Sequence, residues 1–347
     1  MAASLDVRGL TVELPTPTGW VRPVNDVSFT LARGETLGIV GESGSGKTML
    51  SLALMGLEPH GGRREGEAWL HPRNPSANGH GNGSTSMGDL KEDAANLDAP
   101  RENLVALSPE KMREVRGREI AMIFQEPMTA LNPVLRIGAQ IEEAIRVHEP
   151  RAATNDIRRR ALAAIERAAL SDPERRARQY PHQLSGGLRQ RVMIAMALAA
   201  GPGVLIADEP TTALDVTVQK QILELLAKLG RDLQLSMLFI THDLGVVAQV
   251  ADRVAVMYAG RIVEAGPVSE VLQAPAHPYT QALLRAAPRL AREKLVPIPG
   301  VVPSLDALPP GCAFAPRCPH HVPECDAAVP DFRAVNTNHH ARCILVP

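Results

Sequence analysis

Residues 41–48 read GESGSGKT, a set of side chains better suited to holding phosphate than to filling a core. They follow the apolar segment ETLGIV and precede TMLSLALMGL, so the pattern Gly-x4-Gly-Lys-Thr lies between a predicted strand and a predicted helix, as in a phosphate-binding loop. Its glycines let backbone N–H groups approach phosphate oxygens, and the helix N-terminus adds partial positive charge. A plain Gly/Ser-rich connector is disfavoured, because the fixed positions and both flanks fit the loop. The predicted phosphate contacts are Gly41, Ser43, Gly44, Ser45, Gly46, Lys47 and Thr48.

Two charged or hydroxyl side chains of this phosphate loop have specific expected roles. Lys47 is expected to reach the β- and γ-phosphates of a nucleotide, and the Thr48 hydroxyl to coordinate Mg²⁺. The segment VLIADEP ends an apolar strand in two carboxylates, so Asp208 is predicted to orient Mg²⁺ and Glu209 to take the proton from an attacking water. Two carboxylates that begin a helix cap are the ordinary alternative, and the phosphate loop makes that interpretation the weaker one.

A second glycine-rich stretch, LSGGLRQR at residues 184–191, also precedes a predicted helix and can form another anion-binding end. One nucleotide needs only one phosphate loop. Two such ends therefore indicate composite sites, in which each ATP lies between the phosphate loop of one subunit and Ser185, Gly186 and Gly187 of another. An ordinary glycine turn is the alternative, which the Ser-Gly-Gly-x-x-Gln pattern shortly before Asp208 disfavours.

Strands and helices in alternation must position these residues. Short strands are predicted within residues 5–40, a helix from Lys47, and helices over much of 137–200. The strand GVLIAD, a helix over 217–233, the strand LSMLFIT, a short helix and the hairpin RVAVMYAGRIVEAG follow. This alternation predicts an α/β fold with a mostly parallel sheet covered on both faces. One face of the 217–233 helix is predicted to be apolar, through Val218, Ile222, Leu225, Leu229 and Leu233.

Shifts in composition divide the chain. Residues 1–265 are predicted to form a nucleotide-binding domain, with an antiparallel β portion at the N-terminus and a helical subdomain at about 126–195. Residues 72–101 are rich in Asn, Gly, Ser and Pro, and are predicted to be a flexible surface insertion. Residues 266–347 contain much Pro and His and every cysteine, which predicts a small C-terminal extension.

The overall composition bears on the class of protein. A chain of 347 residues that is 45% apolar can build a large core, and its net charge of −1 gives no indication of a nucleic-acid partner. The longest apolar run, residues 192–207, is interrupted by Gly-Pro-Gly and is too short for a membrane span. The N-terminus lacks the basic and apolar parts of a signal peptide. We expect a cytoplasmic protein that meets a membrane only through another protein.

Taken together and in order, the motifs resemble those of the ATP-binding subunit of an ABC transporter, specifically of the oligopeptide/dipeptide importers. The resemblance is carried by GESGSGKT, the glutamine of IFQEPMTALNP, LSGG, ADEP, TALD at 212–215 and the histidine of FITHD. AHPYT at 276–280 and IPGVVPSLDALPPGCAFAPRC at 298–318 resemble the C-terminal extension of this subgroup. The resemblance covers nearly the whole chain except residues 72–101, which lengthen the interval between Lys47 and Gln125.

The resemblance implies roles for further residues. Gln125 would ligate Mg²⁺ or the attacking water, and its loop would face a membrane subunit. His242 would contact the γ-phosphate and help to position water, and Asp215 would reach across a dimer interface. The aromatic side chain that stacks on adenine is assigned to Trp20, which follows a Thr-Gly turn, with packing of a β-hairpin as the alternative.

The resemblance further implies ATP hydrolysis, with Mg²⁺, that powers peptide import. Two ATP-binding subunits, copies or paralogues, would close head to tail over two ATP molecules. Two membrane permease subunits and, indirectly, an extracytoplasmic peptide-binding protein would complete the importer, with this chain peripheral on the cytoplasmic face of the membrane. Importers of nickel or glutathione look alike at this level. A soluble ABC-type ATPase of DNA repair or translation is disfavoured by the single cassette and the lack of a heptad run, and a purely regulatory iron–sulfur protein by the complete catalytic set.

The cysteines are confined to the C-terminal extension, as Cys312, Cys318, Cys325 and Cys343. This clustering favours one local site over disulfides spread through a secreted fold. Four thiolates can hold a [4Fe–4S] cluster, the Cys-Pro pair resembles those of cluster loops, and the extension is similar to ones that bind such a cluster in some family members. Free thiols are the second alternative. Zinc, with a nearby histidine replacing a thiolate, is the third, because the tight Cys pair of structural zinc sites is missing.

Overall fold

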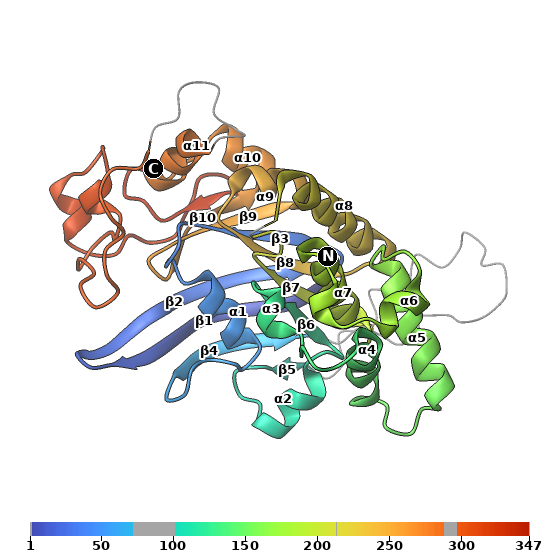
Figure 1. The fold of residues 1–347 in the computed structure, drawn as a ribbon. Helices are drawn as coiled ribbons and strands as arrows, with labels where there is room; N and C mark the ends of the chain where they lie inside the picture. The colour runs from blue at the N-terminus through green and yellow to red at the C-terminus, as the bar shows by residue number, and fades with distance from the viewer. Residues whose placement is uncertain (1, 72–100, 213, 288–296, 347) are drawn as a thin grey trace, which may run out of the picture.

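The structure is a computed structural model that describes residues 2–71, 101–212, 214–287 and 297–346. Within these residues the chain forms two sheets, a set of helices at one end and a C-terminal extension at the other (Figure 1). Apart from Arg101, the predicted insertion at 72–101 lies outside the described residues.

The smaller sheet is antiparallel and lies near the N-terminus, with the strand order β2-β1-β4-β5. Its strands are β1 (Ala3–Thr16), β2 (Gly19–Ala32), β4 (Arg63–Leu70) and β5 (Glu102–Asn103). Along β1 the residues Leu5, Val7, Leu10 and Val12 are buried, which gives this sheet the apolar inner face that antiparallel sheets turn toward a core. The antiparallel β portion predicted at the N-terminus is thus present.

The larger sheet has the strand order β11-β12-β10-β9-β3-β8-β7-β6 within the described chain. The strands from β9 to β6 run parallel, whereas β10, β12 and β11 are antiparallel to their neighbours. Its members are β3 (Thr36–Val40), β6 (Ile120–Ile123), β7 (Val204–Asp208), β8 (Ser236–Thr241), β9 (Arg253–Tyr258), β10 (Arg261–Pro267), β11 (Arg333–Ala334) and β12 (His340–Ala341). Every residue of β7 and β8 is buried, as expected of parallel strands covered on both faces. The predicted α/β fold is confirmed.

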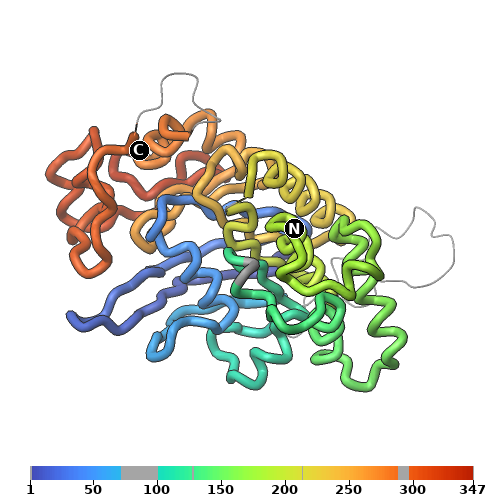
Figure 2. Tube along the Cα trace, in the orientation of Figure 1, coloured from blue at the N-terminus to red at the C-terminus, as the bar shows by residue number. Residues whose placement is uncertain are grey.

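Helices connect the strands and form the far end of the molecule, where α4, α5 and α6 lie opposite the C-terminal extension (Figures 1 and 2). The α-helices are α1 (Lys47–Leu54), α2 (Pro109–Val115), α3 (Pro127–Ala130), α4 (Ile137–Arg146), α5 (Thr154–Arg167), α6 (Pro173–Arg178), α7 (Gly186–Leu198), α8 (Val216–Leu233), α9 (Leu244–Val250), α10 (Val268–Gln273) and α11 (Pro278–Ala286). Three short 3-10 helices are η2 (Pro181–Gln183), η3 (Ala315–Arg317) and η4 (Pro323–Asp326) in the described residues.

Side chains of β7 show how the two faces of the larger sheet are covered. Leu205 and Ala207 point into a core built with α7 and α8, whereas Val204 and Ile206 join a second core with α1 and the smaller sheet. Helices therefore cover one face, and the second face is covered by the antiparallel sheet as well as by a helix. The predicted apolar face of α8 is present: Ile222, Leu225 and Leu229 are buried, and Val218 and Leu233 are partly buried against the first core.

The C-terminal extension is built into the larger sheet, because β12 pairs with β10 and β11 pairs with β12. Glu264 of β10 is fully buried beneath it and accepts hydrogen bonds from His277 N–H at 2.9 Å and Ala276 N–H at 2.7 Å, with the His339 ring nitrogen also at 2.7 Å. A buried carboxylate needs such partners. The extension continues the larger sheet at β10 (Arg261–Pro267), so the predicted domain boundary at residue 266 falls inside this strand.

Candidate nucleotide-binding site

The phosphate loop, residues 41–48, joins β3 to α1 in the predicted strand-loop-helix arrangement. Gly46 caps α1 with a positive φ of 103°, and a Cβ at this position would lie 1.9 Å from the Pro23 carbonyl oxygen. A Cβ at Gly41 would lie 2.1 Å from the Met257 carbonyl oxygen. The backbone of β2 and the end of β9 thus pack directly against the loop, and only glycine fits at these two positions.

Lys47 is buried and folds back over the loop. Its ammonium group donates to the carbonyl oxygens of Gly41 at 2.8 Å and Glu42 at 2.9 Å. Burial lowers the pKa of Lys47, and the carboxylates of Glu209 and Asp208 oppose that shift. Because a buried ammonium gains most from a fully charged partner, the phosphate oxygens of a nucleotide would be stronger partners for it than these carbonyls.

Asp208 lies at the end of β7 beside two hydroxyl groups of α1. Ser51 donates to its carboxylate at 3.1 Å and Thr48 at 3.4 Å. Burial raises the pKa of Asp208, a shift that a bound cation would reverse by favouring the ionised form. Carboxylate and hydroxyl oxygens are the ligand types that Mg²⁺ takes, so Thr48 and Asp208 fit the metal position predicted for them.

Glu209 contacts side chains from the loops that follow β6, β7 and β8. Its carboxylate accepts hydrogen bonds from Thr212 Oγ1 at 2.8 Å and Gln125 Nε2 at 3.3 Å, and His242 Nδ1 lies at 3.3 Å. Its φ of 45° is left-handed, a conformation that costs a non-glycine residue about 1–2 kcal/mol and is often kept where a side chain must be aimed. Glu209, Gln125 and His242 are therefore brought together, and their catalytic roles stay predictions.

Strand order explains this convergence. Gln125 follows β6, Glu209 follows β7, His242 follows β8 and the phosphate loop follows β3, and these four strands are neighbours in the larger sheet. Because they are parallel, their carboxyl ends meet at one edge, which is where open α/β sheets bind ligands.

The ion pair between His242 and Glu209 predicts a pH dependence of stability. Their contact raises the pKa of His242 above its ordinary 6.5 and lowers that of Glu209 below 4.5. The His242 contribution is fully present below about pH 6.5 and is lost as the pH rises through its folded-state pKa, whereas the Glu209 contribution is present above about pH 4.5 and is lost in acid. We expect His242→Gln to lower the melting temperature most between about pH 4.5 and 6.5, measured by thermal unfolding across pH. An equal effect at pH 9 would contradict this account of the pair.

The second glycine-rich stretch opens α7, as predicted. Ser185 is the N-cap, both it and Gly186 are exposed, and the Ser185 side chain makes no capping hydrogen bond to the described part of this helix. A Cβ at Gly187 would lie 2.5 Å from a methyl group of Val218, so α7 packs closely against the start of α8. An exposed, uncapped helix end leaves backbone N–H groups free for an anion. Within one chain this end packs beside α8 rather than over the phosphate loop.

Two further predicted residues have observed contacts. Asp215 is the N-cap of α8, and its carboxylate accepts the Val218 N–H at 2.9 Å. Trp20 is near the start of β2 with 46% of its surface exposed, and the Arg63 guanidinium lies 4.1 Å from its ring centroid. Both positions remain compatible with the predicted roles at a dimer interface and at adenine.

The four cysteines line a single cavity in the C-terminal extension. Cys312 N–H donates to the Cys325 carbonyl oxygen at 2.7 Å, which ties two of the segments together. Burial raises the pKa of Cys312 to about 11 and also raises that of Cys318 and Cys343. Among the residues that the structure describes, however, no three His, Cys, Asp or Glu side chains are grouped closely enough to hold a metal ion.

Comparison with known proteins agrees with this geometry. The family model described as ABC transporter matches residues 24–212, and the model for the oligopeptide/dipeptide transporter C-terminal region matches residues 263–325. The chain belongs to the ABC transporter family. The whole chain is 49% identical to a putative peptide import ATP-binding protein of Brucella ovis, over 98% of this chain and 96% of that protein. A similar protein of Brucella abortus is 46% identical over 91% of this chain and 87% of its own length.

Solved structures resemble the cassette as well. A dimeric ATP-binding cassette in a post-hydrolysis state, bound to ADP and Pi, matches with a TM-score of 0.61 and 25% identity, covering 76% of this chain and 98% of that one. A second dimeric bacterial ABC transporter cassette matches with a TM-score of 0.60 over the same shares. Membership of the family makes this cassette an ATPase that uses ATP and Mg²⁺. None of its described helices has the length and apolar character needed to cross a bilayer.

Several side chains of the ATPase site were not predicted from the sequence. Ser51 supports Asp208, and Thr212 supports Glu209. Tyr279 and Arg317, from the C-terminal extension, contact Glu42 of the phosphate loop. The first two could have been found from spacing, because Ser51 follows Thr48 by one turn of α1 and Thr212 follows Glu209 by three residues in a turn. The last two are more than 230 positions away from Glu42, and spacing gives no signal for them.

Proposed function

We propose that this cassette hydrolyses ATP to power the import of dipeptides or oligopeptides through separate membrane permease subunits. The observation that carries the proposal is the C-terminal region of the oligopeptide/dipeptide transporter type, folded against the ATPase site. The names of the Brucella relatives as putative peptide import proteins support it.

Nucleotide binding and hydrolysis each have a proposed set of residues. The phosphate loop holds ATP, Thr48 and Asp208 hold Mg²⁺, and Glu209 takes the proton from the attacking water. Gln125 and His242 position that water, since both lie 3.3 Å from the Glu209 carboxylate. Trp20 stacks on adenine in this proposal, in a position exposed to solvent.

A second cassette, a copy or a paralogue, is proposed to supply Ser185, Gly186 and Gly187 to each ATP, with Asp215 near the same interface. The exposed start of α7 supports this arrangement, because the side chain of its N-cap residue, Ser185, makes no capping hydrogen bond in the described structure. The dimeric state of the similar solved cassettes also supports it. Closure of the dimer on ATP and reopening after hydrolysis would then move the attached permeases.

The loop after Gln125 is the proposed contact with the permease. Phe124, Val134 and Leu135 are exposed apolar residues on either side of it, with Val134 exposed to 76%. Val134 and Leu135 are adjacent in sequence, and neighbouring exposed apolar side chains support a protein partner at this loop. The chain would thus be peripheral on the cytoplasmic face of the membrane, with a peptide-binding protein acting on the far side of the permeases.

Uptake of labelled peptides tests the transported substrate. Cells that lack this chain should lose uptake of a labelled dipeptide or oligopeptide, and the wild-type chain, but not Glu209→Gln, should restore it. If peptide uptake were unaffected and uptake of nickel or glutathione were lost instead, peptide import would be the wrong assignment.

We further propose that the four cysteines bind a [4Fe–4S] cluster with a structural role. They line one cavity whose walls include Phe314, Pro330 and Leu345, and an apolar wall is compatible with such a cluster. Reactive free thiols need a cationic neighbour that lowers their pKa, whereas burial raises the pKa of Cys312 here. When bound, the cluster would supply iron–thiolate bonds that join the segments of the extension. The thiols would have to move closer together to bind it.

Metal analysis of the anaerobically purified full chain tests the cysteine site. We expect about four irons and four sulfides per chain, with a visible absorption band, and loss of both in Cys318→Ser, because a cubane needs its thiolate ligands. Zinc measured on the same sample is the control for the competing metal. A chain with no iron, or with one zinc instead, would contradict the cluster.

A further inference from the structure

Glu42, the second residue of the phosphate loop, is held by two side chains of the C-terminal extension. Arg317 of η3 donates to both carboxylate oxygens, with Nη1 at 2.7 Å and Nη2 at 3.1 Å. The Glu42 N–H donates to the Tyr279 hydroxyl oxygen at 2.8 Å. The backbone and the side chain of one loop residue are thus both anchored outside the ATPase core. We call these contacts of Arg317 and Tyr279 the Glu42 clamp.

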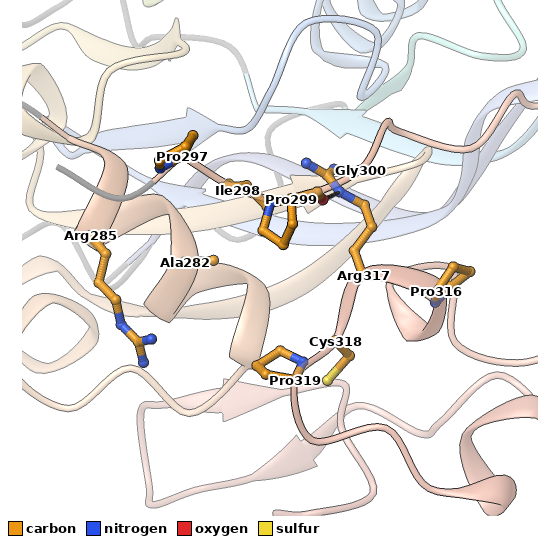
Figure 3. A pocket seen from close by; sticks show the side chains of 10 residues that line it. All are labelled: Ala282, Arg285, Pro297, Ile298, Pro299, Gly300, Pro316, Arg317, Cys318 and Pro319. Atoms are coloured by element: carbon orange, nitrogen blue, oxygen red, sulfur yellow. Dashed lines mark hydrogen bonds between the residues drawn. The ribbon is translucent and has the colours of Figure 1, made fainter.

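Arg317 is fixed in place before it reaches Glu42. Its side chain is only 4% exposed, its Nε donates to the Pro299 carbonyl oxygen at 2.9 Å, and Nη1 lies 3.3 Å from the Tyr258 hydroxyl. Figure 3 shows its guanidinium beside Pro299 and Gly300 in the pocket that it lines. A guanidinium held by several partners loses little further freedom on pairing, so this bidentate contact differs from a surface ion pair.

Glu42 needs such a partner because of its position. Its carbonyl oxygen accepts from the Lys47 ammonium at 2.9 Å, so the residue borders the group predicted to bind the β- and γ-phosphates. Its side chain is 27% exposed and carries the same sign of charge as a nucleotide. An unpaired carboxylate at this point would repel phosphates and compete for Lys47, because charges this close interact strongly where a protein surface limits access of water.

We propose that Arg317 and Tyr279 are positioning residues of the ATP site, through which the C-terminal extension sets the affinity of the phosphate loop for ATP. Arg317 neutralises the Glu42 carboxylate and keeps it turned away from Lys47. Tyr279 fixes the backbone at the entrance to the loop. Neither residue takes part in hydrolysis, so the clamp acts on nucleotide binding and not on the chemical step. The inference rests on ATP binding by this loop, which the wild-type chain tests separately.

The test compares four full-length variants for binding of the non-hydrolysable ATP analogue AMP-PNP with Mg²⁺. Arg317→Gln should raise the Kd about tenfold, equal to about 1.4 kcal/mol. Arg317→Gln combined with Glu42→Gln should return the Kd toward that of Glu42→Gln alone, because no unpaired charge remains. Arg342→Gln is the matched control: Arg342 also belongs to the extension and donates to the carbonyl oxygens of Ile262 and Pro330, but not to the phosphate loop.

Steady-state kinetics separate positioning from a general structural defect. Arg317→Gln should raise KM for ATP with little change in kcat per folded chain, whereas partial unfolding would lower the apparent kcat. A folded Arg317→Gln with wild-type Kd, or a double variant no better than Arg317→Gln, would overturn the inference. If Arg317→Gln does not fold, Tyr279→Phe, which removes only the hydroxyl, must still weaken AMP-PNP binding, and an unchanged Kd would overturn it. A wild-type chain that binds no AMP-PNP would instead refute the ATPase assignment itself.

Discussion

Replacement of Glu209 by glutamine is expected to lower the rate of ATP hydrolysis by about 10²–10⁴-fold, the usual contribution of a general base. The amide has the same shape and can still accept the Thr212 hydroxyl, which lies 2.8 Å from the carboxylate in the wild-type chain. It cannot take a proton from water. ATP binding should therefore persist, and the ATP-bound cassettes should accumulate as a closed dimer.

Phosphate release and nucleotide binding, measured on the same sample, check this result. Glu224→Gln is a suitable control, since Glu224 is an exposed residue of α8 that forms an ion pair with Lys220 of the same helix. The control should hydrolyse ATP at the wild-type rate. Wild-type turnover by Glu209→Gln would show that another group serves as the base.

Replacement of Gly46 by alanine is expected to abolish ATP binding and to destabilise the fold by roughly 2–3 kcal/mol or more. The new Cβ would lie 1.9 Å from the Pro23 carbonyl oxygen, in a residue whose φ is 103°. The backbone of β2 at Pro23 cannot move aside as a flexible side chain could. The loop must therefore shift, and Lys47, the next residue, shifts with it. Thermal unfolding and AMP-PNP titration measure the two effects.

Gly44→Ala is the matched control for stability. Gly44 also has a positive φ, of 79°, but a Cβ there would meet nothing within 4 Å. Its cost should be limited to the conformational strain of about 1–2 kcal/mol. If the two variants unfolded at the same temperature, the close approach of β2 to the phosphate loop would not explain the need for glycine at residue 46.

Because the chain belongs to the ABC transporter family, each of these defects in ATP use should affect transport. Loss of hydrolysis with retained binding should arrest uptake at the ATP-bound state, whereas loss of binding should prevent dimer closure altogether. Loss of the Glu42 clamp should cause a third kind of defect, in which ATP is still hydrolysed but a higher concentration of ATP is needed. Comparison of uptake at low and high ATP would distinguish the three.

Local chemistry explains why the phosphate loop and Asp208 were predictable. A loop that binds phosphate needs glycines, a lysine and a hydroxyl within eight positions, between a strand and a helix, and all of these appear in residues 41–48. The apolar run before Asp208 predicts a buried strand just as directly, and every residue of β7 is buried in the structure. The roles of Gln125 and His242, in contrast, came from resemblance to a family.

Other features depended on segments that are far apart in sequence. The smaller sheet covers one face of the larger one, β12 joins β10, and Arg317 reaches Glu42 across 275 positions. Periodicity describes one segment at a time and contains no information about which strand edge another segment will join. The packing of the cysteine segments around one cavity likewise depends on contacts between distant parts of the chain.

The α/β fold, the phosphate loop and a carboxylate at the end of a buried strand were predictable from the amino-acid sequence, because they depend on residue types over a few neighbouring positions. The contacts of Gln125 and His242 with Glu209, and the contact of the extension with Glu42, are visible only in the folded chain. The first set of contacts follows from strand order, because β6, β7 and β8 are adjacent and parallel and the residues that follow them meet at one edge. The contact with Glu42 instead follows from the packing of the extension, 275 positions away, against the phosphate loop.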